Sequence, residues 1–161
     1  MTPKDSYVAQ RCAEIEANLV DAVGWSATDA KLGAFLAGYV TVLISGVVED
    51  CVEYLVKQRA DRSNDPELTE LVSHLVAGSF SNPRSNYIAR LLGMFSLEYE
   101  QRYQALVPLT SREALGSIMA NRLSLAHTGT WRQQTTIADV QSYFARIVPI
   151  IAIVEEILLP P

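Results

Sequence analysis

Apolar residues recur every three or four positions along nearly the whole chain, and this period most constrains what the chain can fold into. Such spacing lines one face of an α-helix, whereas a half-buried β-strand needs strict alternation, which no stretch of strand length shows. The 161 residues are enough to bury one sizeable core. We therefore predict an all-α fold, a single domain over residues 1–161, built as a bundle of four principal antiparallel helices plus short helices.

The expected helices end at recognisable signals. Gly24 is expected to end the first helix, and Thr28 or Asp29 to cap the second. A break is expected near residues 93–96, and Pro149 predicts a kink or a break in the last helix. The expected ranges are residues 4–23, 29–60, 66–78, 84–106, a helix from the Thr110–Glu113 capping box to a stop at Gly129, and 137–158.

The composition favours an assembly of two copies. Apolar residues make up 49% of the chain and charged residues only 19%, which is rich in apolar and poor in charged residues for a monomer. The second expected helix is apolar on more than one face, as is typical of a helix that is buried on most sides. We expect a homodimer, with this helix central and facing the second copy.

Charge is unevenly distributed along the chain. The net charge of −5 argues against non-specific coating of nucleic acid. Residues 71–132 nevertheless carry six arginines, no lysine and three glutamates, whereas the segments on either side are acidic. Arginine is the cation best suited to forked recognition of phosphate. The central segment is therefore where we look for a phosphate-binding site.

Other classes of protein have little support in the sequence. The only cysteines, Cys12 and Cys51, lie among apolar residues at helical spacing, so we expect reduced core side chains. Two cysteines and two scattered histidines do not predict a zinc site, and we expect no metal and no cofactor. We see neither a signal peptide nor a span without charges long enough for a bilayer, so we expect a cytoplasmic protein without a membrane partner.

One short segment combines a phosphate-binding cation with a side chain that titrates near neutral pH. It runs from Asn121 and Arg122 to His127, just before a glycine that can stop the helix. On a straight helix Arg122 and His127 point about 140° apart. Either the helix unwinds at its end, or two copies meet on a twofold axis and pool two such pairs in one cleft.

These residue types suit RNA cleavage without a metal ion. The 2′-hydroxyl of the substrate would attack the adjacent phosphate, with His127 as the base or acid and Arg122 stabilising the charge on phosphate. The plain alternative is a solvated arginine and a helix-capping histidine. Composition alone supplies such a pair readily, so the residue types by themselves favour that alternative.

At these residues the chain resembles the HEPN superfamily (higher eukaryotes and prokaryotes nucleotide-binding), and most closely its RiboL-PSP-type members. That family is an all-α bundle with Arg-x4–6-His near the end of a late helix, matched here by Arg122-x4-His127. The apolar stretch from Ala34 to Val48 followed by Glu49 resembles the family's helix with an embedded acid, and residues 136–143 resemble the start of its last helix. The family's polar residue after the arginine is Leu123 here, a departure that bears on RNA positioning.

The resemblance implies a metal-independent endoribonuclease acting as a homodimer, the toxin or effector of a bacterial defence or toxin–antitoxin system. Its partners would be RNA and an antitoxin or other protein. Arg122 and His127 carry over as catalytic residues in a cleft at the homodimer interface. Glu49 carries over as an acid that orients Arg122 or His127, or is simply an exposed acid.

RNA-binding candidates flank the motif. They are Asn121, Trp131 and Arg132, the last two by stacking or by binding phosphate, although Trp131 and Arg132 could equally pack over the helix end. The alternative function is a non-catalytic HEPN-like module that binds a nucleotide or a protein. Leu123 and the net charge of −5 favour that alternative.

Overall fold

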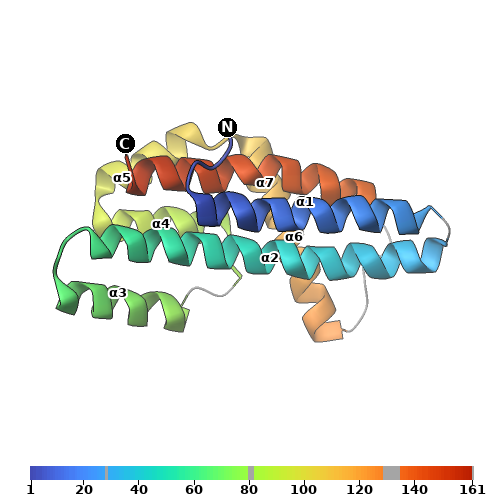
Figure 1. The fold of residues 1–161 in the computed structure, drawn as a ribbon, viewed down its shortest axis with the longest axis horizontal. Helices are drawn as coiled ribbons and strands as arrows, with labels where there is room; N and C mark the ends of the chain where they lie inside the picture. Colours follow the sequence, from blue (N-terminus) through green and yellow to red (C-terminus); the bar gives the residue numbers. More distant parts are fainter. Residues whose placement is uncertain (28, 80–81, 129–134, 161) are drawn as a thin grey trace.

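Seven helices make up the described part of the chain in a computed structural model of the protein (Figure 1). The structure describes residues 1–27, 29–79, 82–128 and 135–160, without the side chains of residues 77–79 and 128. No strand occurs among these residues, which confirms the all-α class. The helices are α1 (Ser6–Ser26), α2 (Ala30–Asp61), α3 (Pro66–Ser79), α4 (Ser85–Phe95), α5 (Leu97–Leu106), α6 (Leu109–Thr128) and α7 (Ile137–Leu158).

Three of the four long helices lie side by side, and the fourth crosses them. Figure 1 shows α1, α2 and α7 along the long axis of the molecule, with α6 running across them and emerging beyond α2. The long helices form the expected all-α bundle, with α6 at an angle to the other three. The buried side chains of α6 lie between Ser111 and Asn121, so its last turn leaves the core.

Helix α2 is the central helix, as predicted. It packs against α1, α3, α6 and α7, and 14 of its 32 residues are buried. By length and composition, α2 and α7 are each apolar enough to cross a membrane, a test that the core helices of soluble proteins also pass. About half of the most apolar stretch of each helix is buried inside the bundle, 50% in α2 and 56% in α7.

Most expected helix ends are confirmed, but the signals at Gly24 and Thr110 were misread, and a break at Pro149 does not occur. The Asp29 side chain caps α2, and Ser96 separates α4 from α5. Helix α1 continues past Gly24 to Ser26. Helix α6 begins at Leu109, with the Pro108 carbonyl accepting its first hydrogen bonds, so Thr110 lies inside the helix and is not its cap. Helix α7 continues unbroken through Pro149.

The apolar spacing of residues 66–78 predicts that Leu68, Leu71, Val72, Leu75 and Val76 point inward, which is wrong for the three leucines. Val72 and Val76 are buried, but Leu68, Leu71 and Leu75 are 37%, 56% and 46% exposed. Helix α3 packs chiefly against α2, so only one of its sides is covered. With α2 and α4, its leucines line an apolar groove of about 360 Å³.

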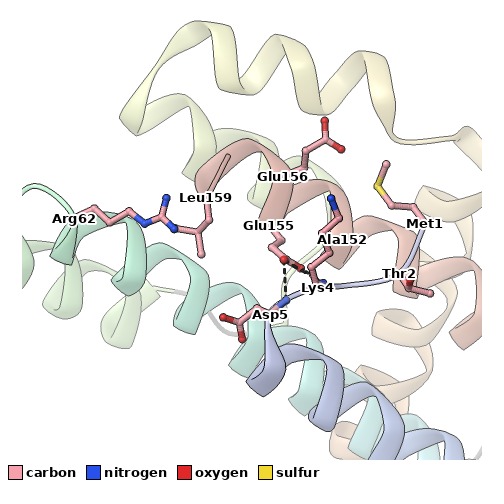
Figure 2. Close-up of a pocket in the computed structure, with 9 residues that line it drawn as sticks. All are labelled: Met1, Thr2, Lys4, Asp5, Arg62, Ala152, Glu155, Glu156 and Leu159. Atoms are coloured by element: carbon pink, nitrogen blue, oxygen red, sulfur yellow. Dashed lines mark hydrogen bonds between the residues drawn. The ribbon is translucent and has the colours of Figure 1, made fainter. Parts of the chain in front are cut away.

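The N-terminal segment is fastened to the last turns of α7. The largely buried carboxylate of Glu155 accepts the backbone N–H groups of Lys4 and Asp5, at 2.9 to 3.1 Å (Figure 2). Asp5 in turn caps α1 through its side chain. The segment between Met1 and α1 is thereby held beside the end of α7, where it borders a shallow pocket.

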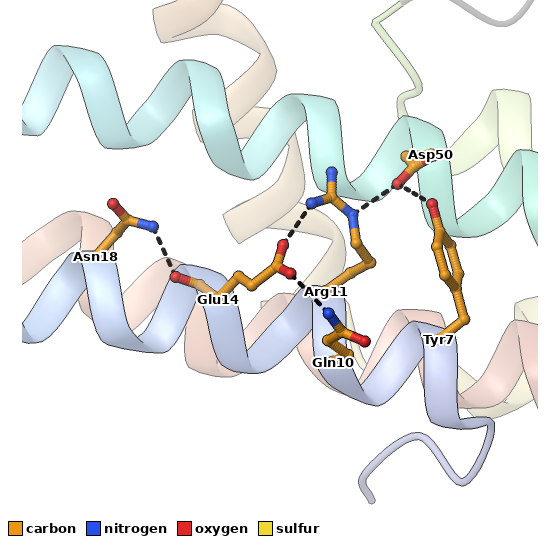
Figure 3. Close-up of polar contacts among 6 residues, drawn as sticks. All are labelled: Tyr7, Gln10, Arg11, Glu14, Asn18 and Asp50. Carbon is orange, nitrogen blue, oxygen red and sulfur yellow. Dashed lines mark hydrogen bonds and ion pairs between the residues drawn. The ribbon is translucent and has the colours of Figure 1, made fainter.

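A polar cluster joins α1 to α2 on the outside of the bundle. The Asp50 carboxylate accepts hydrogen bonds from the Tyr7 hydroxyl and from Arg11 Nε, each at 2.8 Å (Figure 3). Arg11 also pairs with Glu14 on its own helix. Next to this cluster, Cys12 is a buried free thiol, as predicted.

Candidate functional site

The Arg122–His127 motif lies on the part of α6 that leaves the core. Met119 is fully buried against Ser45 of α2, at 3.3 Å between sulfur and hydroxyl. Beyond Asn121 no described side chain of α6 is buried, and Figure 1 shows this end of the helix projecting past α2. The core therefore fixes the first part of α6 and presents its last turns to solvent.

The structure brings Arg122 and Glu49 together. One guanidinium nitrogen of Arg122 lies 2.7 Å from Glu49 Oε1 of α2, with 31% and 19% of the two side chains exposed. The pairing follows from the crossing of the two helices. Ser45 contacts Met119, and one turn further along each helix Glu49 contacts Arg122. The charge of Arg122 is thus held in place by an acid from another helix.

Glu49 also holds the segment that leads into α4. The same Oε1 accepts the backbone N–H of Asn82 at 2.5 Å. Among the described residues other than glycine, only Asn64 and Asn82 have a positive φ, 54° for Asn64 and 60° for Asn82. Asparagine tolerates this conformation better than most residues. The sequence does not predict this contact, because a backbone donor has no signature in the pattern of side chains.

His127 lies on the exposed surface and apart from Arg122. Helix α6 is regular through Thr128, so the end does not unwind before His127. The two side chains therefore leave the helix in directions about 140° apart. The sequence left two ways to bring Arg122 and His127 to one cleft: unwinding of the helix end, or a second copy. Because α6 stays helical, only the second way is compatible with the structure.

Of the three candidate RNA-binding residues, only Asn121 lies in the described part of the structure. Asn121 is only 6% exposed, and its side-chain N–H group donates to the Thr135 hydroxyl at 3.3 Å. Asn121 therefore links α6 to the segment that leads into α7. Leu123 is 41% exposed. Trp131 and Arg132 lie outside the described residues.

Several arginines of the positive segment are engaged within the fold. Arg112 donates to the Val107 and Gln104 carbonyls and so closes the end of α5. Arg102 pairs with Glu156 of α7 at 3.5 Å. Arg84 and Arg90 are exposed. The positive charge available for a ligand near α6 is thus smaller than the sequence suggests.

Four well-formed pockets of the described residues are lined by residues other than Arg122 and His127. One of the four, about 460 Å³ between α6 and α7, reaches Asn121. Within the same residues no group of three or more His, Cys, Asp or Glu side chains is placed to hold a metal ion. The Arg122–His127 end of α6 is a protruding surface in a single copy.

Comparisons with protein-family models, with curated proteins and with solved structures return no match in any of the three. The class of protein is therefore defined by the fold and the site themselves. It is an all-α bundle in which an acid of the central helix holds an arginine near the free end of a crossing helix, with an exposed histidine beyond it.

Proposed function

We propose that this protein is a metal-independent endoribonuclease of HEPN type that acts as a homodimer. The observation that carries the proposal is the 2.7 Å contact between Arg122 and Glu49, one and a half turns before the exposed His127. An arginine oriented by an acid can present its remaining N–H donors to a phosphate in a fixed direction. By its resemblance, the protein would be the toxin or effector of a bacterial defence or toxin–antitoxin system.

The reaction requires a proton acceptor, a proton donor and a cation. His127 takes the proton of a ribose 2′-hydroxyl, and the resulting oxygen attacks the adjacent phosphorus. The bond to the 5′-oxygen of the next nucleotide breaks, that oxygen receives a proton from an imidazolium, and a 2′,3′-cyclic phosphate remains. Arg122 stabilises the charge that builds on the phosphate oxygens. Because the two side chains diverge on α6, a second copy closes the cleft in which the strand lies.

The experiment is cleavage of RNA in the presence of EDTA, comparing wild type with His127→Ala. His74→Ala is a matched control, because His74 is the only other histidine and its side chain is 80% exposed on α3. We expect cleavage by wild type and by His74→Ala, and a loss of at least about a hundredfold in His127→Ala, the usual range for an acid–base residue. Equal cleavage by all three proteins, or by none, would sink the catalytic proposal.

A non-catalytic binding module is the second candidate. Two observations favour it: Glu49 already neutralises Arg122, and Asn121 is buried. RNA binding measured by fluorescence anisotropy, together with growth on expression, separates the two. A nuclease cleaves the bound RNA and slows growth, with both effects lost in His127→Ala. A binding module retains RNA intact and leaves growth unchanged.

A further inference from the structure

An apolar stripe lies exposed along the first half of α2. Phe35, Tyr39 and Val42 are 71%, 51% and 45% exposed, which is unusual for large apolar side chains on a central helix. They follow one another at steps of four and three residues, so they share one face. Continuing these steps leads through Gly46 to Glu49 and Glu53. The stripe thus runs directly to the Glu49–Arg122 pair.

The stripe is free of charge in its middle and oppositely charged at its ends. No charged residue occurs between Lys31 and Glu49. Lys31 is exposed at the start of the stripe, and Glu53 is half-buried at its far end. Val42 lies midway between Lys31 and Glu53, eleven residues from each. A twofold axis at Val42 would therefore set Lys31 of each copy opposite Glu53 of the other.

The same twofold arrangement matches shapes as well as charges. A side chain added at Gly46 would meet nothing within 4 Å, so the surface is open there. In the antiparallel arrangement, Tyr39 of one copy faces this opening in the other, since the two positions lie at nearly equal distances from Val42. A parallel arrangement would instead set Glu49 and Glu53 against their own copies and repel.

We propose that a second copy of this chain docks on the Phe35–Tyr39–Val42 stripe, with the two α2 helices antiparallel about a twofold axis at Val42. The axis makes the contact self-complementary and closed. It also sets the Phe35 end of one copy beside Glu49 and the projecting end of α6 of the other. That link to the cleft rests on the proposed function, but the dock itself does not.

The mass of the protein in solution tests whether two copies associate through the stripe. Light scattering should give about 35 kDa for wild type, twice the chain mass of 17.7 kDa, and the monomer mass for Val42→Glu. Leu71→Glu is the matched control, since Leu71 is a comparably exposed apolar residue on α3 and should leave the dimer intact. A monomeric wild type, or a dimer lost in Leu71→Glu but kept in Val42→Glu, would overturn the dock.

Disulfide cross-linking tests the position of the axis without relying on a disruptive variant. Two Val42→Cys copies face each other at the axis and should join under mild oxidation. Two Phe35→Cys copies would lie about 21 Å apart along the helices, beyond the roughly 7 Å that a disulfide spans. The native Cys12 and Cys51 are buried and should not cross-link one copy to the other. Cross-linking of Phe35→Cys as fast as Val42→Cys would contradict the antiparallel arrangement.

A charge swap tests the ends of the stripe. Lys31→Glu and Glu53→Lys should each weaken the dimer about tenfold, because each places like charges together twice. The double variant restores both pairs and should return to near wild-type affinity. Failure of the double variant to recover would overturn the register.

A monomeric wild type that sediments with phosphatidylcholine–phosphatidylglycerol vesicles would assign the stripe to a membrane surface instead. None of these measurements depends on RNA cleavage, so failure of the dock and failure of the nuclease are distinguishable.

Discussion

Glu49 combines two tasks in one carboxylate oxygen, since it pairs with Arg122 and accepts the backbone N–H of Asn82. Replacement by Gln keeps an acceptor for Asn82 and loses only an ion pair between partly exposed side chains, so we expect a cost of about 0.5 kcal/mol in unfolding free energy. Replacement by Ala removes both contacts and should cost about 1–3 kcal/mol. Urea unfolding measures both variants, and a Gln variant as unstable as the Ala variant would contradict the shared-acceptor geometry.

Tyr103 should make the fold sensitive to alkali. Its side chain is 1% exposed and shares a hydrogen bond of 3.0 Å with the Ser85 hydroxyl. Burial raises the pKa of Tyr103 to about 12. The unfolded chain releases this proton first, so the stability due to Tyr103 is present below the ordinary tyrosine pKa of about 10 and is lost as the pH rises through about 12.

Denaturant unfolding at increasing alkaline pH, for wild type and Tyr103→Phe, measures this effect. Wild type should lose stability more steeply than Tyr103→Phe above about pH 10. Tyr87→Phe is the control, because Tyr87 is 51% exposed and should follow wild type. Parallel curves for wild type and Tyr103→Phe would show that Tyr103 is not buried as described.

At the scale of helices, α7 begins with a reciprocal capping box. The Thr136 hydroxyl accepts the Asp139 backbone N–H, and the Asp139 carboxylate accepts the Thr136 backbone N–H and hydroxyl. Thr136→Ala should cost about 0.5–2 kcal/mol in unfolding free energy. Hydrogen bonds from the Thr136 backbone and side chain lower the pKa of Asp139.

The Asp139 contribution should disappear in acid. A lowered pKa stabilises the fold above the ordinary aspartate value, and this contribution is lost as the pH falls through the lowered value. The gap in melting temperature between wild type and Asp139→Asn should therefore be present at neutral pH and close in acid. A gap that stays constant with pH would mean that the carboxylate does not cap α7.

The helices were predictable because their signals are local. Apolar spacing, Asp29 and Ser96 each act within a turn or two of their own position. The errors in side-chain direction concern partners distant in sequence. The Leu71 side of α3 is exposed because α2 covers only one side of that helix, and no local pattern says which side will find a partner. The direction of α6 likewise depends on residues distant in sequence, since α6 packs against α2 and α7.

The candidate site was predictable in part. The motif and the resemblance pointed to Glu49 as a residue that could orient Arg122, and the structure brings the two together. Asn121 was named for its polarity, yet it is buried against the start of α7, because the direction of a helix face depends on the whole packing. Asn82 could not be predicted, since it acts through its backbone.

At the scale of the whole molecule, the described residues leave apolar side chains exposed on α2 and α3, and the end of α6 projects beyond α2. The stripe of α2 and the projecting end of α6 adjoin at Glu49 and Arg122, whereas the groove of α3 lies on other residues. A dimer through α2 would cover the stripe and turn a protruding helix end into one wall of a cleft. In the proposed dimer, assembly and catalysis would be linked through the central helix.

The proposed reaction is cleavage of RNA by His127 and Arg122 through the substrate's own 2′-hydroxyl. The most direct measurement compares, in EDTA, cleavage of a mixed-sequence RNA pool with cleavage of the same pool carrying a methyl group on every 2′-oxygen. We predict cleavage of the unmodified pool with 2′,3′-cyclic phosphate ends, none of the methylated pool, and none of either pool by His127→Ala. Cleavage of the methylated pool, or of the unmodified pool by His127→Ala, would contradict the account.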